Sequence, residues 1–212
     1  LVRELVAGIA APLVLDADGL HPFAGARGAR GDGGAWAALK ARKAATILTP
    51  HPGEAARLLG TSAADINRDR VGTARRLVDR TGAVVVLKGA ATVVAAPSGR
   101  VAVVPTGSSA LATGGTGDVL TGVIAGLLAQ QSIGRKGRGG TEPFEAAALG
   151  AWVHGRAGDR IAARRGAVGL LAGEVVAELP GTISALRQSG TPRSEEASEL
   201  ETPSVGLALP FP

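Results

Sequence analysis

Short apolar runs that alternate with helical segments constrain the fold of this chain more than any other feature. Leu13-Val14-Leu15, Ala44 to Thr49 and Val84-Val85-Val86-Leu87 have the length and composition of buried strands. Helical spacing of apolar residues fills the intervals, for example in Asp65 to Arg80, whose Arg run we interpret as a solvated face. This alternation is typical of an α/β protein.

Length and composition limit the class of protein further. The 212 residues are enough for one domain with a substantial core, and 45% of them are hydrophobic. We expect no membrane segment, because no apolar run approaches the roughly 20 residues that span a bilayer. The absence of cysteine excludes disulfides and thiol chemistry and fits a cytoplasmic location.

The net charge of +5 and the pI near 10.6 suggest nucleic acid as one partner. Against this, the basic residues are spread along the chain and aromatic residues make up only 2% of it, so a stacking platform for bases is missing. We therefore expect no nucleic-acid partner. The spacing of residues also indicates no zinc site.

The stretch Ala112-Thr113-Gly114-Gly115-Thr116-Gly117-Asp118, followed by an apolar run to Leu128, has the pattern of a phosphate cradle. Glycines permit a tight turn close to a ligand, and the helix that follows begins with unpaired N–H groups and a positive dipole end. The hydroxyls of Thr113 and Thr116 can donate to a phosphate. Asp118 would repel that phosphate unless a metal ion, a substrate hydroxyl or a proton transfer engages it. It therefore has either a chemical role or only an effect on the first helical turn.

Two further motifs follow the ends of strands, where open α/β sheets bind ligands. Pro50-His51-Pro52-Gly53-Glu54 stiffens the loop around His51, which favours contact with a ligand over a purely structural role. Glu54 is interpreted as a helix-start residue. Lys88, before Gly89, follows a buried strand, where a lysine charge costs free energy unless an anion binds it. We therefore expect Lys88 to bind a phosphate. Asp16 and Asp18 fit either a ligand contact or a simple turn.

The remaining segments carry less chemistry. We expect helices at Leu1 to Ala11, Trp36 to Lys43 and Glu54 to Leu59, and a hairpin from Thr92 to Val104. Later helices are expected over Glu145 to Ala163, where His154 is interpreted as structural, and over Val168 to Leu179. Loops are predicted over Phe23 to Gly34 and Ser132 to Pro143. A domain over 1–187 and a disordered tail over 188–212 complete the prediction.

Three motifs in this order closely resemble the ADP-dependent NAD(P)H-hydrate dehydratase family. They are Thr49-Pro50-His51-Pro52-Gly53-Glu54, Val86-Leu87-Lys88-Gly89-Ala90-Ala91-Thr92 and Leu111-Ala112-Thr113-Gly114-Gly115-Thr116-Gly117-Asp118. The similarity runs from Leu1 to about Pro180. It implies a ribokinase-like three-layer α/β/α sandwich with a mostly parallel central sheet.

The resemblance also implies a reaction, in which a lyase converts the S-epimer of hydrated NADH or NADPH back to NAD(P)H. ADP or ATP is the co-substrate, ADP gives AMP and phosphate, and Mg²⁺ is expected on the phosphates. Asp118 is implied as the base, and His51 and Asp118 as contacts of the hydrated dinucleotide. Nucleotide contacts are implied for Lys88, Gly89, Ala90, Ala91, Thr92, Gly114, Gly115, Thr116 and Gly117.

The family resemblance also sets expectations about partners and completeness. Members have additional residues ahead of the point where this chain begins, so we expect part of the hydrate-binding surface and the first strands to be missing. A homo-oligomer, tetrameric in the family, and an associated or fused NAD(P)H-hydrate epimerase are implied. Two alternatives stay open: a small-molecule kinase of the same superfamily, and a nucleotide-binding remnant without turnover.

Overall fold

The computed structural model describes residues 1–24, 33–133 and 142–189. Its centre is a sheet in the order β1-β2-β3-β4-β5. Strands β1 (Leu13–Leu15), β2 (Thr46–Leu48) and β3 (Val84–Leu87) are parallel neighbours. The hairpin of β4 (Thr92–Ala95) and β5 (Val101–Val104) adds two antiparallel pairings, so that only β4 opposes the direction of the other strands.

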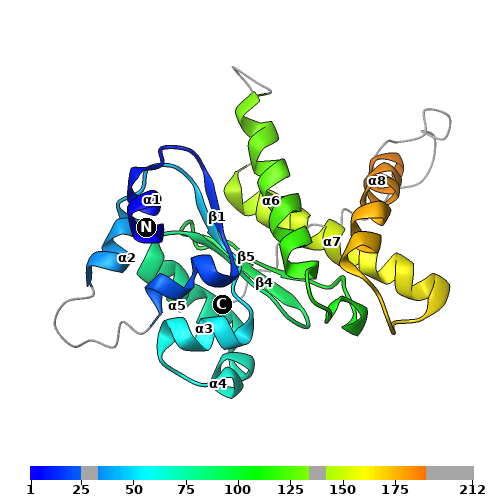
Figure 1. Ribbon diagram of the computed structural model, residues 1–212, viewed down its shortest axis with the longest axis horizontal. Coiled ribbons are helices and arrows are strands. Elements are labelled where there is room, and N and C mark those ends of the chain that lie inside the picture. The colour runs from blue at the N-terminus through cyan, green and yellow to red at the C-terminus, as the bar shows by residue number, and fades with distance from the viewer. Residues whose placement is uncertain (25–32, 134–141, 190–212) are drawn as a thin grey trace, which may run out of the picture.

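Helices cover both faces of this sheet (Figure 1). One face carries α1 (Val2–Gly8), α2 (Gly33–Lys40), α3 (Pro52–Leu59), α4 (Ala63–Arg68) and α5 (Arg70–Thr81). The other face carries α6 (Thr116–Ile133) and α7 (Pro143–Arg165), against which α8 (Ala172–Ser189) packs. Short 3₁₀ turns lie at Ala17–Gly19, His21–Phe23 and Ser109–Leu111. The predicted three-layer α/β/α sandwich with a mostly parallel sheet is confirmed.

Alternation of side chains along the strands explains the three layers. In β3, Val85 and Leu87 pack with Leu77 of α5 on one face, whereas Val84 and Val86 pack with Ile124 of α6 on the other. All four residues of β3 are buried, as expected for a strand covered on both faces. The shared direction of β1, β2 and β3 brings their carboxyl ends to one edge of the sheet.

Several predicted boundaries need correction. The helix predicted over Asp65 to Arg80 is two helices, because α4 ends at Arg68 and Asp69 caps α5 through a hydrogen bond from the Gly72 N–H. The last helix begins at Ala172, later than Val168, and continues through Pro180 to Ser189. Most of the two predicted loops, 25–32 and 134–141, and the tail from 190 to 212 lie outside the described residues.

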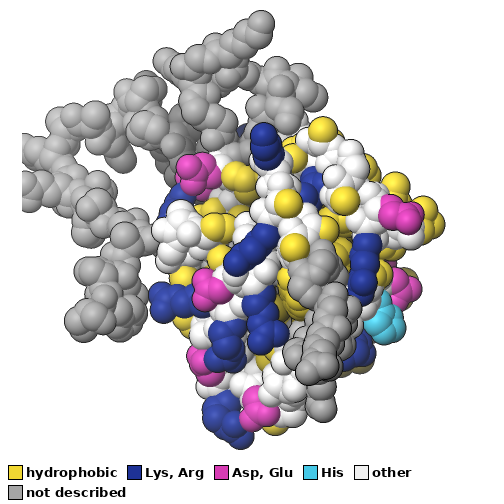
Figure 2. Space-filling model, turned by 90° about the vertical axis from the view of Figure 1, so that its left-hand side faces the viewer, with side chains coloured by type: hydrophobic (Ala, Val, Ile, Leu, Met, Phe, Trp, Pro, Cys, Tyr) yellow, Lys and Arg dark blue, Asp and Glu magenta, His cyan; other side chains and the backbone are white. Residues whose placement is uncertain are grey.

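The exposed surface mixes charges of both signs. Figure 2 shows basic and acidic side chains interspersed on the face that lies at the left of Figure 1, where α1, α2 and α5 are found. In the described ranges, no helix is both long and apolar enough to cross a membrane.

Candidate active site

The carboxyl ends of β1, β2 and β3 bring together side chains that lie far apart in the sequence. Lys88, directly after β3, places its Nζ 2.5 Å from Asp16 Oδ1, directly after β1. Its Nζ is 3.9 Å from Oε2 of Glu54, in the first turn of α3 after β2. The start of α6 is adjacent, because a Cβ added to Gly117 would lie 3.5 Å from Lys88 Nζ. A cation therefore lies beneath the glycine-rich turn.

The glycine-rich turn is shaped by its own hydrogen bonds. Gly115 has a φ of +84°, a conformation that suits glycine. The Thr116 hydroxyl donates to the carbonyl oxygens of Leu111 (2.7 Å) and Thr113 (2.8 Å), so its hydrogen is engaged by the turn rather than directed to a ligand. Thr116 thus fixes the start of α6, where N–H groups of the first turn have no partner within the helix.

The segment after β3 forms a second tight turn. Gly89 has a φ of +138° and Ala91 a φ of +52°, and the Thr92 hydroxyl donates to the Gly89 carbonyl at 3.1 Å. Arg70, at the start of α5, donates through Nη2 to the carbonyls of Leu87 (2.9 Å) and Lys88 (3.2 Å). This contact sets Arg70 apart from the predicted solvated face, because Arg70 supports the turn from below, whereas the other arginines of that run are exposed as predicted.

A pocket of about 360 Å³ lies between these two turns. The two turns contribute Lys88, Gly89, Ala90, Thr92, Thr116 and Gly117 to its lining. The lining also includes the segment 106–109, the apolar side chains of Leu111, Leu120 and Ala151, and His154 and Gly155 of α7. Six of the predicted nucleotide contacts therefore line one cavity. Ala91, Gly114 and Gly115 lie in the adjoining turns without lining it.

His51 begins α3 and lies outside the pocket lining. Its Nδ1 accepts hydrogen bonds from the N–H groups of Gly53 (2.9 Å) and Glu54 (3.2 Å), and the His51 N–H donates to Glu54 Oε2 at 2.7 Å. This is a reciprocal capping box with histidine as the N-cap. Since Nδ1 is an acceptor, the neutral ring carries its hydrogen on Nε2, which lies 3.4 Å from Glu54 Oε1. The exposed imidazole therefore presents a donor.

Asp118 occupies the first turn of α6 and is exposed to solvent. It does not line the pocket, although Gly117 beside it does. Its carboxylate is accessible next to the rim, a placement that leaves it free to meet a second molecule.

Comparison of the sequence with models of known families identifies the family of this chain. The model of NAD(P)H-hydrate dehydratase matches residues 2–181. The chain belongs to this family. The bifunctional NAD(P)H-hydrate repair enzyme Nnr of Moorella thermoacetica is 44% identical over 189 residues, which are 89% of this chain and 32% of that protein. The ADP-dependent (S)-NAD(P)H-hydrate dehydratase of Neisseria meningitidis serogroup B is 46% identical over 130 residues, 61% of this chain and 41% of that protein.

Solved structures agree with the family assignment. The ADP/ATP-dependent NAD(P)H-hydrate dehydratase from Bacillus subtilis, co-crystallized with ATP/Mg²⁺, superposes with a TM-score of 0.66 at 33% identity over 82% of this chain and 55% of that chain. A ribokinase-like superfamily protein from Enterococcus faecalis, with a TM-score of 0.60 and 19% identity over 86% of this chain and 66% of that one, supports the fold alone. The chain spans only about a third of the length of its bifunctional relative.

Several residues of this dehydratase-family site were missed or left undecided by sequence reasoning. Asp16 is in the site, the buried Glu54 approaches Lys88, and Thr121 of α6 donates to Asp16 Oδ2 at 3.0 Å.

His154, interpreted as structural, lines the pocket, and its Nε2 is buried without a hydrogen-bond partner. The role of Arg70 could have been inferred from the sequence. An arginine at the start of a helix is unfavourable with the helix dipole, which indicates that a contact elsewhere in the fold holds it there.

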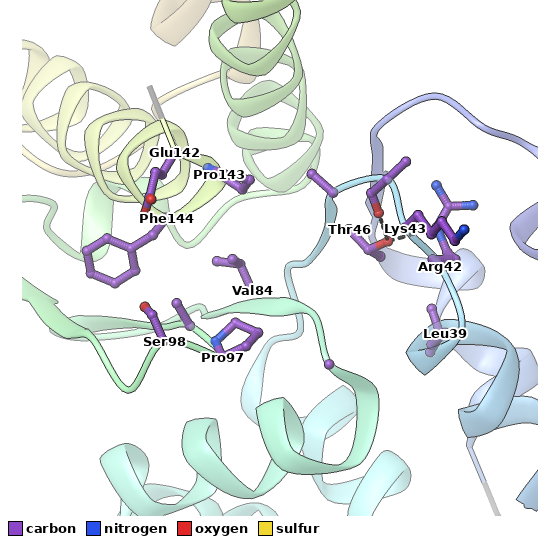
Figure 3. A pocket seen from close by; sticks show the side chains of 14 residues that line it. Leu39, Arg42, Lys43, Thr46, Val84, Pro97, Ser98, Glu142, Pro143 and Phe144 are labelled. Carbon is purple, nitrogen blue, oxygen red and sulfur yellow. Dashed lines mark hydrogen bonds between the residues drawn. The ribbon is translucent and has the colours of Figure 1, made fainter. Parts of the chain in front are cut away.

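A second pocket, of about 240 Å³, lies at the opposite edge of the sheet, next to the start of α7 (Figure 3). It is lined by the amino ends of β2 and β3 and by the turn after β4. Arg42, its most prominent cation, is engaged by the carbonyls of Val6, Ile9 and Ala11 and by the Thr46 hydroxyl. This arginine ties α1 to the sheet instead of directing its donors into the pocket.

Proposed function

We propose that this chain catalyses the ADP-dependent dehydration of the S-epimer of hydrated NADH or NADPH. The observation that supports this most is the position of Lys88, whose ammonium lies beneath the start of α6 and lines the 360 Å³ pocket. A pocket of this size suits a nucleoside. The names of the Neisseria meningitidis and Bacillus subtilis relatives support ADP, or ATP, as the co-substrate.

In this proposal the nucleotide base lies against Leu111, Leu120 and Ala151, which are apolar side chains of the pocket lining. The phosphates meet Lys88 and the N–H groups at the start of α6, where an ammonium and a helix N-terminus act on the same anion. The tight turn from Gly89 to Thr92 closes over the nucleotide. Stabilisation of phosphate charge and fixed orientation supply most of what phosphoryl transfer needs.

The reaction balances in two steps. The ring hydroxyl of the hydrate attacks the β-phosphorus of ADP, its proton passes to Asp118, and the bond to the α-phosphate oxygen breaks to release AMP. The carbon–oxygen bond then breaks with loss of a ring proton, so that inorganic phosphate and NAD(P)H are formed. Asp118 is suited to the first proton transfer because its carboxylate is exposed beside the phosphate site.

We assign His51 and Asp118 to the hydrated dinucleotide. The Nε2–H of His51 can donate to a substrate oxygen, but the ring is unsuited to act as a base because Nδ1 is engaged by the start of α3. An epimerase, fused as the name of the bifunctional relative suggests or separate, would supply the S-epimer.

The residues fit Mg²⁺ only as a partner of the nucleotide. Among the described residues, no group of three or more His, Cys, Asp or Glu side chains could hold a metal ion. Mg²⁺ commonly binds through one or two carboxylates, water and substrate phosphates, and Asp118, an exposed carboxylate next to the pocket-lining Gly117, can offer one. When bound, the ion would neutralise phosphate charge.

The test is recovery of NADH absorbance from chemically hydrated NADH, with ADP and Mg²⁺ present and AMP and phosphate measured in parallel. We expect NADH, AMP and phosphate to appear in equal amounts. Replacing ADP with AMP serves as the control, because AMP has no phosphoryl group to transfer. A chain that binds ADP tightly but forms neither NADH nor AMP would overturn the proposed activity.

A further inference from the structure

Lys88 has two carboxylates within reach, and they do not hold it equally. Its Nζ donates to Asp16 Oδ1 at 2.5 Å but is 3.9 Å from Glu54 Oε2. The lysine side chain is 18% exposed and that of Asp16 only 9%, so water screens the pair little. Asp16 therefore determines where the ammonium lies.

Asp16 is itself held by the helix that forms the cradle. The Thr121 hydroxyl, one turn into α6, donates to Asp16 Oδ2 at 3.0 Å, while Oδ1 accepts from Lys88. A Cβ added to Gly117 would lie 3.6 Å from Asp16 Oδ2 and 3.5 Å from Lys88 Nζ. The carboxylate thus connects the end of β1, the end of β3 and the start of α6 at one point.

We infer that Asp16, oriented by Thr121, is a positioning residue that holds the Lys88 ammonium under the start of α6 in readiness for the phosphates. Lysine has a long flexible chain, so ordering it beforehand removes part of the entropic cost of binding. The ammonium has three hydrogens, and a single bond to Asp16 leaves two for phosphate oxygens. The inference rests on the proposed function only in taking a nucleoside diphosphate as the ligand.

Removing the charge of Asp16 should change the position of the Lys88 ammonium. In Asp16→Asn the shape and the Thr121 contact are kept, but Glu54 becomes the nearest carboxylate to Lys88. Glu54 is on α3, which covers the opposite face of the sheet from α6, so we expect the ammonium to shift away from the phosphate site. ADP affinity should then fall even though a negative charge has been removed from the neighbourhood of the phosphates.

The first experiment is a double-mutant cycle on ADP binding, measured by calorimetry with Asp16→Asn, Lys88→Met and the double variant. We expect Asp16→Asn alone to raise the Kd about tenfold, and to change it less than about twofold in the Lys88→Met background. Asp18→Asn, the same change two residues away on an exposed side chain, is the matched control and should leave the Kd unaltered. Equal effects of Asp16→Asn in both backgrounds would overturn the inference, since Asp16 would then act independently of Lys88.

A second measurement needs no nucleotide. Acetylation of lysines by N-hydroxysuccinimidyl acetate, followed by mass spectrometry, reports how firmly Lys88 is held, with exposed Lys40 and Lys43 as internal references. Asp16→Asn should increase labelling of Lys88 several-fold and leave the references unchanged. An unchanged Lys88 rate would overturn the positioning role. If the wild-type chain fails to bind ADP, the proposed function fails, while this labelling ratio still decides the role of Asp16.

Discussion

At the scale of single residues, Lys88 and Asp118 divide the work between binding and chemistry. Lys88→Ala removes a charged donor from the pocket, so ADP binding should weaken by about 1 to 3 kcal/mol. Asp118→Asn should abolish turnover and leave the affinity for ADP, measured without Mg²⁺, nearly unchanged, because Asp118 lies outside the pocket lining. Calorimetry and the NADH recovery assay measure the two effects. Unchanged ADP affinity in the first variant, or near-normal turnover in the second, would contradict the assignment of that residue.

His51 combines two roles that different substitutions separate. Asparagine at the N-cap can accept from the N–H groups of Gly53 and Glu54, as Nδ1 does, but has no donor at the position of Nε2. His51→Ala should lower the free energy of unfolding by about 1 kcal/mol, and His51→Asn by much less. Both should lose substrate affinity. Denaturant unfolding and the KM for hydrated NADH check this, and equal destabilisation by the two variants would refute the capping role.

At this scale, the sequence predicted the role of a side chain only where a continuous local motif contained it. The motifs around His51, Lys88 and Gly117 are continuous, and each interpretation needed only the residues next to it. Asp16 was left undecided because its partners Lys88 and Thr121 are 72 and 105 positions away. Such partners are determined by the sheet order, which no short stretch of sequence contains.

At the scale of elements, α7 determines the shape of the pocket through its glycines. A Cβ added to Gly155 would lie 2.4 Å from the Thr106 hydroxyl and 2.6 Å from its carbonyl carbon. Gly155→Ala should therefore push away the Thr106–Leu111 segment, lowering both stability and ADP affinity. Gly126→Ala in α6, where a Cβ meets nothing within 4 Å, is the matched control and should stabilise by about 0.5 to 1 kcal/mol. Thermal unfolding and ADP titration report both, and a Gly155→Ala protein that unfolds and binds like wild type would contradict this packing.

Element boundaries followed from sequence where composition was distinctive. The apolar run of β3 and the turn of the β4–β5 hairpin were predicted at the residues where they occur. The break at Asp69 contains neither glycine nor proline, and its only local signal is Asp69 itself, an N-cap residue that the helical pattern on both sides obscured. In α8, Pro180 suggested an end, but packing against α7 and the pairing of Glu178 with Arg160 and Arg164 continue the helix beyond it.

At the scale of the whole molecule, Glu178 and His154 make stability depend on pH in separate ranges. Hydrogen bonds from Arg164 and Arg160 lower the pKa of Glu178 to about 2, below its usual 4.5. The contribution of this carboxylate between α7 and α8 is therefore present above pH 4.5 and lost as the pH falls toward 2. Measurements at pH 5 and above keep this contribution nearly constant, so that the effect of His154 can be examined separately.

Burial lowers the pKa of His154 from its usual 6.5, against the opposing effect of a hydrogen bond with the backbone of Thr116. The unfolded chain therefore takes up a proton at a higher pH than the folded chain does, so the contribution of this ring to stability is full above pH 6.5 and declines as the pH falls. The slope from this one group reaches at most about 1.4 kcal/mol per pH unit.

The variant His154→Gln has no proton to gain in this range. Its free energy of unfolding, from urea titrations at pH 7, 6 and 5, should therefore decline less than that of the wild type, whatever the difference at pH 7. Parallel declines would mean that the ring charges within the fold. Protonation of this ring would then add a positive charge close to Lys88 and Thr116, where the phosphates are proposed to bind, and ADP affinity, instead of stability, would change with pH.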